Sequence, residues 1–102
     1  MAVPTLLQFP QTLDARIRRA IHDKRRIDVT YNGRTRRAEP HDYGRINGVD
    51  RLFVFQLDKN AWRMFDVPKI EALVVLDGTF AGSRRQAHEH HHRWDEIYAR
   101  VE

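Results

Sequence analysis

The fold is decided by the segment Arg25-Arg26-Ile27-Asp28-Val29-Thr30-Tyr31-Asn32-Gly33-Arg34-Thr35-Arg36-Arg37. Asn32-Gly33 between two alternating runs predicts a β-hairpin, because a two-residue type I′ turn needs positive φ at both central positions. That turn predicts four opposed pairs: Tyr31 with Arg34, Val29 with Arg36, Ile27 with Ala38, and Asp28 with Arg37. Side chains alternate across a strand, so Arg36 shares the apolar face with Val29. A charge on that face needs a partner.

Length and composition limit the class of protein. The chain has 102 residues and no cysteine, which predicts one small domain without disulfides or a thiolate metal site. It contains no apolar run near the roughly 20 residues of a membrane-spanning helix. Residues 1–11 also lack the basic region and apolar length of a signal peptide. We therefore expect a cytoplasmic protein with no membrane partner and no cofactor.

The positive charge of the chain is concentrated near its N-terminus. The net charge is +4, and residues 16–37 hold nine Lys or Arg side chains against two Asp. Residues 38–102 hold nine against eleven acids. This asymmetry indicates an anionic partner. Alternatively, the cluster is a solvated helix face followed by an edge strand on which basic side chains discourage pairing.

Short strands with tight turns dominate the expected fold. Residues 1–11 form an arm, and a helix begins after Thr12, a good N-cap. We expect further strands over residues 51–57, 62–67 and 70–76, with Pro40 interrupting the second hairpin strand. Ser83 and Gln86 fit a capping box, which predicts a C-terminal helix over residues 83–101 packed on the same domain as residues 12–82. The predicted class is α+β, mainly β: a small antiparallel five-stranded barrel or strongly bent sheet with a helix at each end.

Two constellations of polar side chains suggest chemistry. His88, His92 and Asp95 share one face of the predicted C-terminal helix, and two imidazoles at i and i+4 can chelate zinc or nickel. The alternative is a polar helix face. His41 and Asp42 are adjacent in a turn, where they rarely make a productive base and orienter, and Ser83 is the one serine. With no phosphate-cradling glycine loop either, we predict that the protein is not an enzyme.

Arginines beside aromatic residues form the third constellation. Arg63 alternates in phase with Phe65, so a second arginine shares a face with apolar side chains. Bases stacked on aromatic rings with guanidinium groups on phosphate are how small barrels hold single-stranded nucleic acid. The aromatic residues can equally form the core. A buried arginine is costly alone, so either Glu39 or Asp66 pairs with it or an anionic ligand does.

These residues together resemble the WYL domain family of bacterial transcriptional regulators. The resemblance covers residues 13–80 and rests on three motifs: the helix followed by the strand ending in Tyr31, Arg36-Arg37-Ala38-Glu39-Pro40, and Arg63-Met64-Phe65-Asp66-Val67-Pro68-Lys69-Ile70. The family's Trp-Tyr-Leu triplet is replaced by Leu52-Phe53-Val54, and its second arginine of the late motif by Lys69. We expect a stand-alone module, since residues 1–11 cannot hold the family's usual helix-turn-helix domain.

The resemblance implies an SH3-like, Sm-type barrel that senses a ligand. Carried over by position, Arg36, Phe53, Arg63 and Lys69 would line its site. We therefore expect a non-enzymatic regulatory module that binds single-stranded DNA, RNA or a nucleotide. One alternative is a protein-interaction or homodimerisation module in which the arginines are structural. A further alternative is a metal-binding protein that uses the C-terminal histidines.

Overall fold

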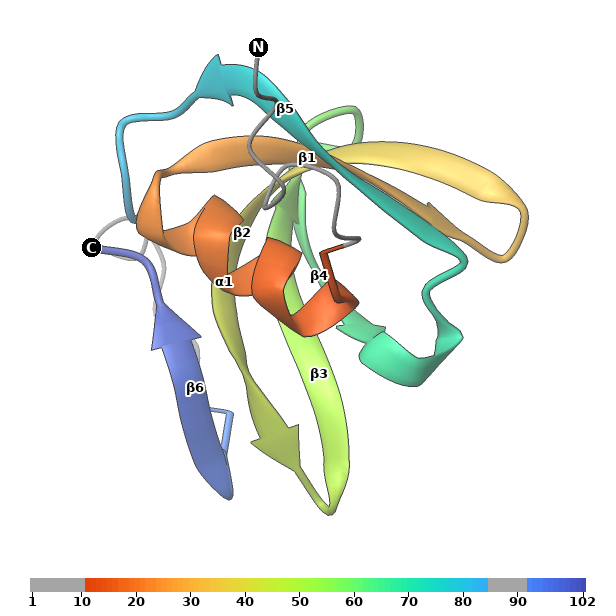
Figure 1. The fold of residues 1–102 in the computed structure, drawn as a ribbon, viewed down its shortest axis with the longest axis vertical. Helices are drawn as coiled ribbons and strands as arrows, with labels where there is room; N and C mark the ends of the chain where they lie inside the picture. The colour runs from red at the N-terminus through yellow and green to blue at the C-terminus, as the bar shows by residue number, and fades with distance from the viewer. Residues whose placement is uncertain (1–10, 85–91) are drawn as a thin grey trace, which may run out of the picture.

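The computed structural model describes residues 11–84 and 92–102 as an antiparallel six-stranded sheet with one α-helix (Figure 1). The strand order is β4-β3-β2-β1-β5, with β6 paired to β2. The predicted mainly β class is therefore confirmed. The sheet is strongly bent, but within the described residues no pairing between β4 and β5 closes it into the predicted barrel. The elements are α1 (Leu13–His22), β1 (Arg25–Tyr31), β2 (Arg34–Ile46), β3 (Val49–Gln56), β4 (Ala61–Asp66), the 3₁₀ turn η2 (Val67–Lys69), β5 (Ala72–Thr79) and β6 (Glu96–Arg100).

The β1–β2 hairpin has the predicted register. Its loop lies at the far right of Figure 1, and all four predicted pairs are present. Asn32 and Gly33 have φ values of 52° and 74°, as the type I′ turn requires. On the outer face, Arg37 pairs with Asp28 at 2.9 Å. Local turn chemistry therefore places Arg36 on the core face of the sheet.

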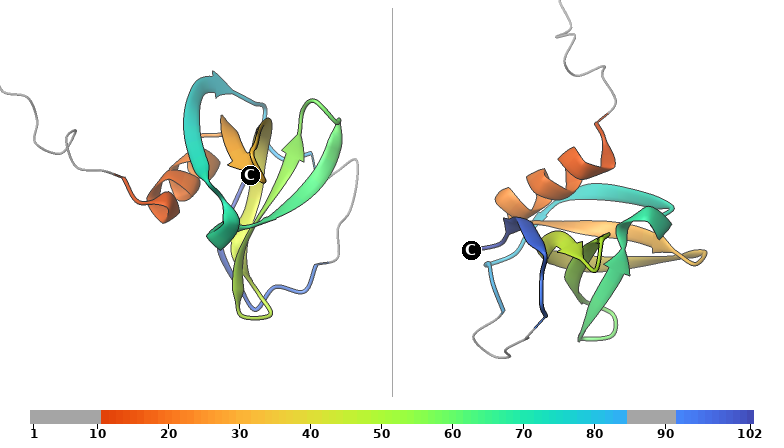
Figure 2. Two further views of the ribbon diagram at one scale, coloured as in Figure 1. Left: turned by 90° about the vertical axis from the view of Figure 1, so that its right-hand side faces the viewer. Right: turned by 90° about the horizontal axis from the view of Figure 1, so that it is seen from below.

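Helix α1 packs against the sheet through an apolar stripe. Thr12 caps the helix, because its Oγ1 accepts a hydrogen bond from the amide of Ala15 at 3.0 Å. Ile17, Ala20 and Ile21 are buried in the main core. The two views in Figure 2 show α1 lying to one side of the bent sheet. The core therefore sits between the helix and the concave face.

Strand β2 is longer than predicted and changes partner along its length. Pro40 was expected to interrupt or end the regular pairing of this strand, and it interrupts the pairing without ending the strand. The pairing with β3 shifts register between Pro40 and Asp42, and this bulge absorbs the missing N–H so that the strand continues to Ile46. The first part of β2 pairs with β1 and residues 42–45 pair with β6. One strand thus joins the hairpin to the C-terminal part of the chain.

The predicted C-terminal helix is wrong where the structure describes it. Glu96–Arg100 forms β6 on the edge of β2, and residues 85–91, including Gln86 of the expected capping box, lie outside the described residues. Ile97, Ala99 and Val101 also fit the period of a strand, and a short apolar run cannot be assigned by periodicity alone. The edge of β2 supplied the backbone hydrogen bonds that favour a strand over a helix for these residues.

Two tyrosines attach α1 and β6 to the sheet. The Tyr43 hydroxyl donates to Asp14 at 2.7 Å, and the Tyr98 hydroxyl donates to Asp50 at 2.7 Å. The Arg18 guanidinium lies 5.7 Å from the centre of the Tyr43 ring and 5.2 Å from that of Tyr98. The hydrogen bond from Tyr43, aided by Arg18, lowers the pKa of Asp14 against the opposing effect of burial.

Replacing Asp14 with asparagine should lower the free energy of unfolding by about 0.5–1 kcal/mol at neutral pH, because asparagine keeps the acceptor and loses the charge. The folded pKa of Asp14 lies below its ordinary value of 3.8, so this stabilisation is complete above that value and disappears as the pH falls through the folded pKa. Urea unfolding at about pH 7 and about pH 2 measures it. If the two proteins differ in free energy of unfolding by the same amount at both pH values, the charge of Asp14 is not the source of this stabilisation.

Candidate anion-binding site

Arg36 is a buried guanidinium on the core face of β2. It lies opposite Val29 and is 5% exposed. Its Nη1 donates to the carbonyl oxygens of Tyr31 at 2.6 Å and Arg34 at 3.3 Å. These bonds pin the side chain to the backbone of its own hairpin. The orientation of the guanidinium is therefore set before any ligand arrives.

Arg63 lies on the same face, on β4. It is opposite Val54 of β3, which belongs to the main core. The Arg63 guanidinium carbon lies 5.2 Å from the centre of the Phe65 ring and 6.0 Å from that of Tyr31. The Tyr31 and Phe65 rings are themselves 4.7 Å apart. The predicted phase of Arg63 with Phe65 is confirmed, and the aromatic pair positions its charge.

Neither acid that was expected to pair with these arginines does so. Glu39 pairs with Arg26 and Arg84, and Asp66 pairs with Arg51 and Lys69. Over residues 11–84 and 92–102, no carboxylate oxygen lies within 4.0 Å of the Arg36 or Arg63 guanidinium nitrogens. Two cations on the core face therefore have no acidic partner in the described part of the chain.

Burial and neighbouring charge both act against the protonated form of Arg36. Burial lowers its pKa most, and the charges of Arg63 and Arg34 lower that pKa further. Asp58 acts in the opposite direction. Arginine nevertheless stays protonated in proteins. An anion placed beside these guanidinium groups would relieve both the desolvation and the repulsion.

The free edge of Arg36 faces away from its hairpin carbonyls. Among the described residues, its Nε and Nη2 atoms have no hydrogen-bond partner, whereas Nη1 has two. Nε–H and Nη2–H form the planar fork that binds carboxylate or phosphate oxygens in pairs. These two donors therefore suit an oxyanion placed beside this nearly buried side chain.

The other two predicted site residues are placed differently. Lys69 is exposed on η2, 3.7 Å from Asp66, whose amide donates to the Tyr31 hydroxyl at 3.2 Å. Phe53 is only 3% exposed and lies on the opposite face of the sheet from the core residue Val54. There it stacks on Trp62, with ring centres 4.9 Å apart. The structure thus gathers Arg36 and Arg63 around Tyr31 and separates Phe53 from them. Tyr31 was missed because it looked like an ordinary core residue.

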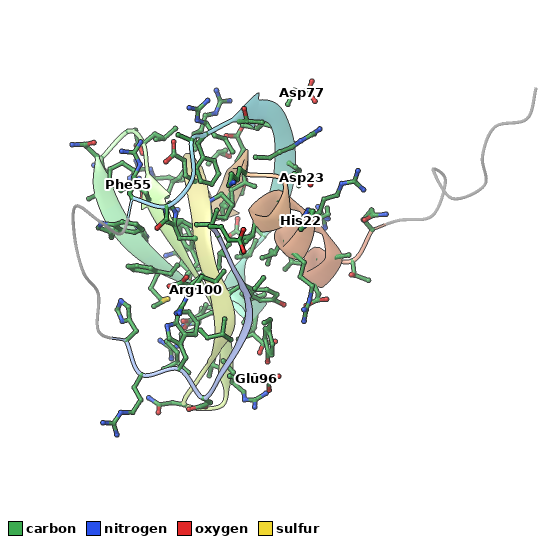
Figure 3. All side chains as sticks on the ribbon, turned by 90° about the vertical axis from the view of Figure 1, so that its left-hand side faces the viewer. His22, Asp23, Phe55, Asp77, Glu96 and Arg100 are labelled. Carbon is green, nitrogen blue, oxygen red and sulfur yellow. The ribbon has the colours of Figure 1, made fainter. Side chains whose placement is uncertain are left out.

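A buried acidic cluster lies on that opposite face. Glu39 bonds Arg84 at 2.7 Å and Arg26 at 3.4 Å, and Asp42 bonds Arg100 of β6 at 2.9 Å. The Arg84 guanidinium carbon also lies 4.1 Å from the centre of the Phe55 ring. Figure 3 labels Phe55 and Arg100 in the view in which β6 crosses in front of the sheet. These carboxylates hold the segment around Arg84 and β6 onto the sheet.

His41 is fully buried next to this acidic cluster. Its Nε2 accepts a hydrogen bond from the amide of Arg84 at 3.1 Å. Its Nδ1 therefore carries the proton and donates to the carbonyl oxygen of Glu39 at 2.9 Å. The imidazole also packs edge-on against Trp62. Both ring nitrogens have structural partners.

The metal and membrane predictions concern other parts of the chain. His88 lies outside the described residues. His92 contacts the Phe53 ring edge-on, and Asp95 accepts a hydrogen bond from the amide of Gly48 at 3.0 Å. Within the described residues, no group of three or more His, Cys, Asp or Glu side chains could hold a metal ion. No helix in the same residues is long and apolar enough to cross a membrane.

Comparison with known proteins gives two matches. The family model described as "WYL domain" matches residues 13–75. Among solved structures, the chain is similar to proteasome accessory factor B/C (PafBC) of Arthrobacter aurescens, with 25% sequence identity and a TM-score of 0.57. That match covers 70% of this chain and 13% of the PafBC chain. No significant match was found among curated proteins.

Proposed function

We propose that this chain, which belongs to the WYL domain family, binds an anionic ligand at Arg36 and Arg63. The family consists of regulatory, ligand-sensing domains. The observation that carries the proposal is the buried Arg36 guanidinium, which has a free donor edge and no acidic partner among the described residues. A fold that keeps such a group gains stability when an anion binds.

Single-stranded nucleic acid or a nucleotide is the ligand class that we propose. Arg36 and Arg63 would neutralise phosphate, and exposed Lys69 would attract the ligand over a longer range. Phe53 remains a candidate for base stacking, but it could stack on a base only if the ring contacts that bury it opened. The Tyr31 and Phe65 rings lie beside Arg63 and are nearer to the proposed phosphate position.

Alanine at Arg36 or at Arg63 should weaken binding of a labelled single-stranded oligonucleotide by about tenfold or more, since each removes one charge-assisted contact. Fluorescence anisotropy with DNA and RNA, at about 50 mM and about 200 mM salt, measures both the loss and the salt slope. Arg37→Ala is the matched control, because Arg37 pairs with Asp28 on the outer face.

The salt dependence of binding and a folding control show whether a loss of affinity reflects the proposed contacts. Each variant should lose part of the salt dependence as well as affinity, because fewer counterions are released. Circular dichroism of each variant shows whether the fold is intact. If the wild-type chain binds neither DNA, RNA nor a mononucleotide at low salt, the proposal is wrong.

A homodimerisation module is the second candidate, and one observation favours it. Val74 on β5 is the one large apolar side chain that is exposed in the described chain, at 55%. It lies on a strand that pairs with β1 on one edge and with no described strand on the other. Analytical ultracentrifugation of the wild type and of Val74→Lys tests this. If the wild-type chain is monomeric at all concentrations, the homodimerisation candidate is wrong.

A further inference from the structure

The β1–β2 hairpin determines which backbone groups of β5 point away from the sheet. In a two-residue type I′ hairpin the residues that flank the turn bond each other, so Tyr31 and every second residue before it in β1 bond β2. Thr30 therefore faces β5, and its carbonyl oxygen accepts a hydrogen bond from the amide of Glu71 at 2.9 Å. Leu73 and Val75 lie opposite residues of β1 that bond β2. Their amide and carbonyl groups therefore point outward, where a further strand would pair.

Arg16 of α1 holds one of these outward groups. Its Nη1 donates to the carbonyl oxygen of Leu73. The helix packs next to β5, as the two views in Figure 2 show. Residues 72–76 of β5 carry no charged side chain. The guanidinium of Arg16 thus brings a charge from the helix to the middle of an apolar edge.

Packing alone does not explain an arginine at this position. The Nε atom of Arg16 is buried and has no hydrogen-bond partner in the described part of the chain. A buried donor without a partner costs free energy. Methionine is also long and flexible and would fill the same space without that cost. The bond to the edge of β5 is the feature of Arg16 that methionine could not reproduce.

We propose that Arg16 caps the outer edge of β5 and excludes β5 of a second copy of this chain from pairing there. A strand that adds to this edge needs the amide and the carbonyl group of Leu73. Arg16 holds the carbonyl, and its guanidinium occupies the place that an incoming N–H would take. Covering an edge with a helix and placing a charge on it are both known ways to prevent intermolecular pairing. This inference goes beyond the proposed function and does not depend on Arg36 or Arg63.

The first test is self-association of Arg16→Met. Sedimentation velocity over a range of protein concentrations should give a dimer association constant about tenfold higher than that of the wild-type chain, because the competing charged hydrogen bond is gone. Hydrogen exchange at the Val75 amide locates the contact, since this group points outward and becomes protected only when a strand pairs with it. We expect its exchange to slow as Arg16→Met associates.

Four variants isolate the cap from other effects of the substitution. Arg19→Met is the matched control on the same helix, because Arg19 is exposed and pairs with Asp23. It should associate as weakly as the wild type. Arg16→Lys keeps a charged donor and should also stay monomeric. Adding Val74→Lys to Arg16→Met places a new charge on β5 and should abolish the association. Arg16→Gln removes the charge but suits a helix, so it repeats the test if Arg16→Met fails to fold.

Each outcome supports or overturns the cap. Stronger association of Arg16→Met or Arg16→Gln, with slower exchange at Val75, supports it. Equal association of the wild type and both variants overturns it. Association without slower exchange at Val75 also overturns it, because the copies then meet elsewhere. A wild-type dimer with a protected Val75 amide overturns it as well, since the edge would then accept a strand with Arg16 in place.

Discussion

Replacing Gly44 with alanine is expected to lower the free energy of unfolding by about 3 kcal/mol and to detach β6 from β2. A Cβ atom at this position would lie 2.1 Å from the carbonyl oxygen of Glu96 and 2.9 Å from the Trp94 ring. The first of these atoms belongs to the backbone of β6 and cannot move alone. The strand must therefore shift away and give up its hydrogen bonds with residues 42–45.

Urea unfolding gives the stability loss, and hydrogen exchange at the amides of residues 96–100 shows whether β6 has separated. Gly48→Ala is the matched control, because Gly48 has a φ of +77° but no atom within 4 Å of its Cβ position. It should cost about 1 kcal/mol through backbone strain and leave β6 protected. If the amides of β6 exchange as slowly in Gly44→Ala as in the wild-type protein, the predicted close packing of β6 on β2 is wrong.

The second large effect is expected for Glu39→Ala, which should cost about 2–3 kcal/mol. Glu39 is 2% exposed and bonds both Arg26 and Arg84. Removing one partner of a fully buried pair costs about 3–5 kcal/mol. The loss is smaller here because the side chains of Arg26 and Arg84 are 36% and 43% exposed and can regain water. The segment around Arg84 should loosen from the sheet.

Thermal or urea unfolding measures this loss, with Asp28→Ala as the matched control. Asp28 makes the same type of carboxylate–guanidinium bond with Arg37, but near the surface, where such pairs contribute about 0–1 kcal/mol. Glu39→Gln keeps the volume and some hydrogen bonding, so its effect should lie between those of the two alanine variants. Equal losses for Glu39→Ala and Asp28→Ala would show that burial of Glu39 contributes nothing.

The parts of the structure that could be predicted are those set by neighbouring residues. Asn32-Gly33 determines the hairpin register, because the turn leaves one way for the two strands to pair. Thr12 marks the helix start through a bond to its own first turn. The phases of Arg36 and Arg63 follow from strand alternation. The face of the sheet on which Arg36 and Arg63 lie could therefore be predicted from the local sequence.

The remaining features depend on contacts between distant parts of the chain. Strand β6 forms because β2 offers an edge, and a helical period fits the same residues. Phe53 was placed with the arginines by its position in the family resemblance. Strand β3 is apolar on both faces, so alternation could not tell which face Phe53 occupies. That Glu39 pairs with Arg84, 45 positions away, also has no local signal.

The open sheet has a consequence for how the protein behaves at high concentration. A sheet that does not close leaves edge strands, and an edge presents unpaired backbone groups to other molecules. Strand β5, which pairs with no described strand other than β1, carries the run Ala72-Leu73-Val74-Val75-Leu76, five apolar residues without a charge. Glu71 and Asp77 flank this run and act as gatekeepers against intermolecular β-pairing. The apolar run of β5 is therefore a candidate site for intermolecular β-pairing, and the two flanking carboxylates limit it.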